Sequence, residues 1–79
     1  MKNIIATIEF TRPCLYYTLS ERICSTGKVY DIECRARDKS EIYDGVSDNL
    51  DAASEIFKKI AEAQVYPQHL LCIIDEMIV

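Results

Sequence analysis

The sequence predicts an α+β fold, in which a four-stranded antiparallel meander sheet is followed by two C-terminal helices packed on one of its faces. Apolar and polar residues alternate in the N-terminal part, as is typical of half-buried strands. Near Ser47 the period changes to the three-to-four spacing of amphipathic helices. The chain of 79 residues has room for one domain. We expect a single domain over 1–79, strands within about 3–46, and helices at about 48–64 and 67–78.

Four runs of residues show the alternation of strands. The sets expected to share the core-facing side are Ile4, Ala6, Ile8 and Phe10; Leu15, Tyr17, Leu19 and Ile23; Tyr30, Ile32, Cys34 and Ala36; and Ile42, Asp44 and Val46. Turn residues separate the runs, because proline cannot donate to a strand ladder and glycine tolerates positive φ. The turns are expected at Arg12-Pro13, at 25–27 and at 38–40.

The C-terminal part shows two helical segments. Ser47, Asp48 and Asn49 are candidate N-caps of the first, and a stripe of apolar residues from Ala53 onward follows at helical spacing. Pro67 suits the first position of the second helix. Its apolar side chains form a broad face, so we expect this helix to be largely covered and Cys72 to be buried.

Composition excludes several classes of protein. No apolar run approaches the roughly 20 residues that span a bilayer, and Glu9 interrupts the only early apolar run, so we expect a soluble cytoplasmic protein. In that compartment the four cysteines are expected to be reduced. The cysteines form no C-x-x-C pair and there is one histidine, so we expect no metal site and no cofactor.

The sequence shows no set of residues that is typical of a catalytic site. His69 could act as a base only with an orienting carboxylate and a nearby nucleophile, and its place in the first turn of a helix favours a structural role. Two glycines are too few for a phosphate-binding loop. Pairs of carboxylates such as Asp31 and Glu33 are typical of a solvated sheet face. We therefore expect no enzymatic activity.

The layout of charge is more informative. Residues 1–40 have seven basic and five acidic side chains, a net of +2, and residues 41–79 have two basic and eight acidic ones, a net of −6. The predicted open side of the sheet combines charged residues with an aromatic one, and cross-strand ion pairs with Arg22 or Lys28 are expected there. The candidate partner-binding residues are Asp31, Glu33, Arg35, Arg37, Arg22 and Tyr16.

Three stretches resemble a family of short proteins of unknown function found in Firmicutes, chiefly clostridia. They are Tyr17-Thr18-Leu19, the strand from Tyr30 to Cys34, and the segment from Val65 to Leu70 that leads to Asp75. The resemblance extends over most of the chain from about Tyr16. It implies a bacterial origin and an order of strands followed by helices, and it implies no particular activity.

These observations favour a small non-catalytic bacterial or phage protein that binds another protein, as a regulator or inhibitor of a larger protein or complex. One alternative is a nucleic-acid-binding module that uses the open sheet face, which the acidic net charge disfavours. Another is an acidic phage-encoded inhibitor of a nucleic-acid-binding defence protein. Because so small a core has little stability to spare, a homodimer is a further expectation.

Overall fold

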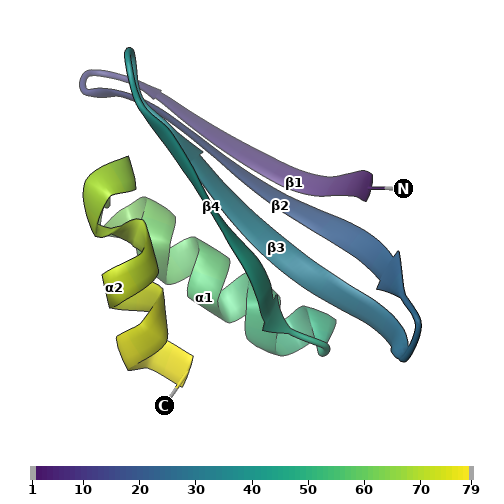
Figure 1. Cartoon of the computed structure of the whole chain (residues 1–79). Coiled ribbons are helices and arrows are strands. Elements are labelled where there is room, and N and C mark those ends of the chain that lie inside the picture. The colour runs from purple at the N-terminus through teal and green to yellow at the C-terminus, as the bar shows by residue number, and fades with distance from the viewer. Residues whose placement is uncertain (1, 79) are drawn as a thin grey trace.

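The computed structural model describes residues 2–78 and contains the predicted order of strands and helices (Figure 1). The elements are β1 (Lys2–Thr11), β2 (Cys14–Cys24), β3 (Gly27–Arg35), β4 (Ser40–Ser47), α1 (Leu50–Glu62) and α2 (Pro67–Ile78). The strand order is β1-β2-β3-β4 with antiparallel neighbours, so the predicted meander is confirmed.

Both helices lie on the same side of the sheet, against β2, β3 and β4 (Figure 1). The opposite side, which we call the open face, has neither helix on it. Strand register and alternation place these side chains on the open face: Lys2, Ile4, Thr7, Glu9, Tyr16, Thr18, Ser20, Arg22, Asp31, Glu33, Arg35 and Ile42.

The core lies between the sheet and the helices. Its fully buried strand residues include Leu15, Tyr17 and Ile32, which confirms the alternation predicted for β2 and β3. The Tyr17 hydroxyl donates a hydrogen bond of 2.7 Å to the carbonyl oxygen of Val65, and the Cys34 thiol donates one of 3.3 Å to the same oxygen. These bonds fasten the connection between α1 and α2 to the middle of the sheet.

The predicted core-facing set of β1 is wrong at one position. The pairing with β2 shifts between Ile4 and Ala6, which marks a β-bulge. Ala6 lies opposite Leu19 on the core side, whereas Ile4 lies opposite Ser20 on the open face and is 67% exposed. A bulge adds one residue to one strand, so it reverses the side of every residue beyond it.

The predicted set of β4 is wrong at Ile42 and Asp44 and correct at Val46. Ile42 lies opposite Glu33 on the open face, Asp44 is exposed, and Val46 is buried. The register between β3 and β4 shifts beside Gly45, whose φ of 71° is a left-handed conformation that glycine adopts without steric cost. The irregularity turns the backbone amide of Gly45 toward the Asp31 carboxylate on β3.

The two helices begin as predicted. Asn49 is the N-cap of α1, and its side chain accepts a hydrogen bond of 3.0 Å from the amide of Ala52. The chain leaves α1 through Gln64, which has a left-handed φ of 52°. Pro67 then starts α2.

The expected coverage of α2 is wrong. Pro67, Leu70 and Ile74 are buried, but Leu71 and Cys72 are exposed. The helix lies mainly along the edge strand β4, so the sheet covers only one stripe of its surface. Ile23, expected in the core, is 63% exposed for a related reason: it lies beside the β2–β3 turn, past the helices (Figure 1).

Candidate binding surface on the open sheet face

Asp31 is the centre of a polar cluster on the open face. Its carboxylate is fully buried and accepts two hydrogen bonds from the Arg22 guanidinium, at 3.1 and 3.2 Å. The backbone amide of Gly45 donates a third at 2.7 Å, and Lys2 Nζ lies 3.3 Å from Oδ2. Burial alone would raise the pKa of the Asp31 carboxyl. The bonds from Arg22, Gly45 and Lys2 outweigh burial and hold this pKa below its ordinary value.

The prediction that Asp31 is a solvated surface charge is therefore wrong. The Gly45 amide reaches it because β4 is irregular at that point, and Arg22 and Lys2 cover it from β2 and β1. The expected cross-strand pair with Arg22 is present, whereas Lys28 pairs with Glu21 at 3.8 Å. The Asp31 carboxylate thus links all four strands of the sheet.

Beside this cluster the open face is hollowed over about 630 Å³. The Arg35 guanidinium lies over the Tyr16 ring, 5.8 Å from its centroid, and its Nε lies 3.8 Å from the Glu33 carboxylate. The residues that line the hollow are Lys2, Ile4, Tyr16, Thr18, Ser20, Glu33 and Arg35. An aromatic ring, an arginine and an exposed isoleucine in one concavity can accept both an apolar and a charged group of a ligand.

The structure brings some of the candidate residues together and separates others. Tyr16, Glu33 and Arg35 line the hollow, and the Arg22–Asp31 pair lies on the same face beside it. Arg37 does not line the hollow; it lines a second cavity at the end of the sheet, and it shares a shallower pocket with Arg35. The candidate residues therefore extend from the hollow to the end of the sheet.

Four residues of the hollow were not among the sequence candidates. Thr18 and Ser20 were expected on this side of β2, but alternation does not reveal that neighbouring side chains leave them only 8% and 7% exposed. Lys2 and Ile4 reach the open face only because of the β1 bulge. No turn residue marks that bulge in the sequence, so alternation alone places Ile4 with the core.

The candidate catalytic groups lie far from this surface or inside the fold. His69 is exposed in the first turn of α2, and Cys34 is buried. Within residues 2–78, no group of three or more His, Cys, Asp or Glu side chains is placed to hold a metal ion. In the same range, no helix combines the length and apolarity that crossing a membrane requires.

The cysteines should differ sharply in reactivity. Burial raises the pKa of the Cys34 thiol to about 11, whereas Cys14 and Cys72 are exposed. Because the thiolate is the reactive form, we expect iodoacetamide at pH 8 to alkylate Cys14 and Cys72 at least about a hundredfold faster than Cys34. Peptide mass spectrometry over a time course measures this. In urea all four thiols should react alike, and equal rates in the folded protein would contradict the burial of Cys34.

Comparisons with known proteins identify a family for this chain, but no individual relative. No curated protein and no solved structure matches the chain. Residues 4–79 match a family of unknown function (DUF6514), which includes every strand and both helices apart from the first residues of β1. The chain therefore belongs to the family of unknown function DUF6514.

Proposed function

We propose that this protein has no catalytic activity and binds another protein through the open face, as a regulator or inhibitor. It would be encoded by a Firmicutes bacterium or by its phage and act in the bacterial cytoplasm. The observation that supports this most is the hollow lined by Tyr16, Arg35 and Ile4. Tyrosine and arginine are enriched among the residues that dominate binding at protein interfaces. Ile4 is 67% exposed beside them, although a folded monomer gains nothing from an isoleucine in water.

The chemistry of the hollow indicates what the partner presents. An apolar side chain would contact Ile4, and an acidic one would meet the Arg35 guanidinium, which is 59% exposed on its side chain. The Asp31 cluster beside it links all four strands of the sheet. The surface is therefore formed before binding, which lowers the entropy lost on association.

A capture experiment tests the proposal. The protein is immobilised and exposed to nuclease-treated lysate of a source bacterium, and retained proteins are quantified by mass spectrometry. We expect a specific partner whose retention falls about tenfold or more with Arg35→Glu, and similarly with Ile4→Asp, because each removes a contact of the hollow. Both residues are exposed, so both variants should fold.

Lys58→Glu is the matched control. It reverses one charge on the exposed side of α1, away from the open face, and should leave retention unchanged. A partner held equally by the wild type, Arg35→Glu and Ile4→Asp would contradict the proposal. A parallel capture uses lysate without nuclease treatment, and a partner retained only there would indicate binding to nucleic acid instead.

A second candidate function rests on the helical side of the molecule. The chain from 41 to 79 has a net charge of −6, and carboxylates such as Asp51, Glu55 and Glu76 are exposed on the helices. Such a surface suits a phage-encoded inhibitor that presents negative charge to a basic nucleic-acid-binding protein. In the capture experiment, this function predicts loss of the partner with Glu55→Lys and no effect of Arg35→Glu.

A further inference from the structure

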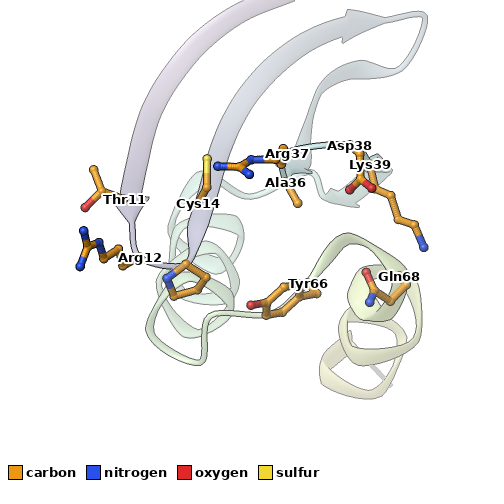
Figure 2. Close-up of a pocket in the computed structure, with 10 residues that line it drawn as sticks. Thr11, Arg12, Cys14, Ala36, Arg37, Asp38, Lys39, Tyr66 and Gln68 are labelled. Atoms are coloured by element: carbon orange, nitrogen blue, oxygen red, sulfur yellow. The ribbon is translucent and has the colours of Figure 1, made fainter.

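A second cavity, of about 550 Å³, lies at the end of the sheet (Figure 2). Three segments far apart in the sequence meet there: the β1–β2 turn, the β3–β4 turn, and the connection into α2. The residues of its lining that matter here are Arg12, Arg37, Asp38, Lys39, Tyr66 and Gln68. Figure 2 shows Arg12 on one side of Cys14 and Arg37 extending toward Cys14 from the other.

In the described part of the chain, the cavity is lined by the cations of the strand half that form no ion pair, whereas the unpaired Lys58 and Lys59 lie on α1. Seven basic residues precede position 41. Four of them form ion pairs with carboxylates, namely Lys2, Arg22, Lys28 and Arg35. Within residues 2–78, the three that form none are Arg12, Arg37 and Lys39, and all three line this cavity. In a chain with a net charge of −4, two guanidinium groups on either side of Cys14 favour an anion at this cavity.

The charge and size of the site narrow the class of anion. Figure 2 shows Lys39 extending away from Cys14, beyond Asp38, so the cations beside Cys14 are Arg12 and Arg37. Their charge of +2 matches the charge of about −1.5 to −2 on a phosphate monoester at pH 7. A single carboxylate would neutralise half of it. Guanidinium groups also bind phosphate oxygens in a bidentate manner. The volume falls in the range of small-molecule sites and leaves room for more than the phosphate.

The remaining lining suits an organic group. Pro13, Ala36 and the ring of Tyr66 supply apolar surface next to the basic side chains. A nucleic acid is a poor occupant, because the acidic helical part of the chain that adjoins the cavity repels an extended polyanion. We propose that this cavity binds a small organic phosphate monoester, with its phosphate between Arg12 and Arg37 and its organic group against Tyr66.

Titration with phenyl phosphate, followed by NMR of the backbone amides, tests this. We expect saturable shifts confined to the three segments of the cavity, and binding about tenfold tighter than that of inorganic phosphate, because only the ester reaches Tyr66. The double variant Arg12→Gln/Arg37→Gln should weaken binding about tenfold or more. Lys58→Gln/Lys59→Gln removes the same charge from α1 and should change it less than about twofold.

A second measurement uses the wild-type protein alone. Cys14 lines the cavity and Cys72 does not, and both thiols are exposed. Phenyl phosphate should therefore slow alkylation of Cys14 by iodoacetamide about fivefold or more at saturation, in proportion to the occupied fraction, and leave Cys72 unchanged. This readout needs no variant to fold.

Three results would overturn the inference: shifts that do not saturate, equal weakening by the two double variants, or alkylation of Cys14 unaffected by the ester. Inorganic phosphate binding as tightly as phenyl phosphate would overturn the role given to Tyr66. The cavity is separate from the hollow on the open face. Loss of phosphate binding in Arg12→Gln/Arg37→Gln with partner capture intact would therefore separate this site from the proposed function.

Discussion

Replacing Asp31 with alanine is expected to destabilise the fold by about 3–5 kcal/mol, because its buried carboxylate accepts hydrogen bonds from a guanidinium and a backbone amide. The change removes the acceptor for the Arg22 guanidinium, the Gly45 amide and Lys2 at once. For 79 residues the whole free energy of unfolding is about 4–12 kcal/mol. Urea unfolding should therefore show a midpoint shifted far down, or a chain already unfolded without denaturant.

Two variants make this result interpretable. Glu55→Gln removes one negative charge from the exposed face of α1 and should change stability by less than about 0.5 kcal/mol. Asp31→Asn keeps an oxygen for the Gly45 amide and loses the charge, so its cost should lie between those of Asp31→Ala and Glu55→Gln. An Asp31→Ala protein as stable as Glu55→Gln would show that the cluster does not hold the strands.

The same carboxylate makes stability depend on pH. The pKa of Asp31 in the fold is lower than its ordinary value of 3.8, so the unfolded chain binds this proton more readily. The contribution of Asp31 is therefore complete above the ordinary value and is lost as the pH falls through the lowered one. Below pH 4 the free energy of unfolding should fall more steeply in the wild type than in Asp31→Asn. Parallel curves would contradict this.

Replacing Tyr17 with alanine should cost about 3–5 kcal/mol, as for other large aromatic residues in cores. Its side chain is fully buried, and its ring meets that of Phe10 edge to face at a centroid distance of 6.1 Å. The loss would open a cavity where the sheet meets the α1–α2 connection. Urea unfolding measures the cost, and a loss below about 1 kcal/mol would contradict this account of the core.

Tyr17→Phe separates the ring from its hydroxyl. The Val65 carbonyl would lose the 2.7 Å bond from Tyr17 but keep the one from the Cys34 thiol. Because this carbonyl retains a partner, we expect a cost of about 1 kcal/mol, at the low end for a buried hydrogen bond. Tyr43→Phe is the control: its hydroxyl bonds to Asp75 in an exposed place, and its loss should cost less than about 0.5 kcal/mol.

Much of the fold could be predicted because its signals are local. A strand shows its period within a few residues, and Asn49 and Pro67 mark helix starts through their own hydrogen-bonding and backbone preferences. The candidate site could be predicted less completely from the sequence. Tyr16, Glu33 and Arg35 follow from alternation, but Lys2 and Ile4 depend on a bulge, and the burial of Asp31 depends on how β4 bends at Gly45.

The sequence by itself determined the order of four strands and two helices and the residues that pack between the sheet and the helices around Tyr17 and Ile32. Only the tertiary structure decided which charges are buried, which apolar residues remain in water, and which cations line the same cavity. Arg12 and Arg37 belong to different turns, and the antiparallel order of the strands places both turns at the same end of the sheet, at one cavity. Alternation describes each strand alone, whereas a bulge or the edge of a helix layer changes the surroundings of residues on several strands.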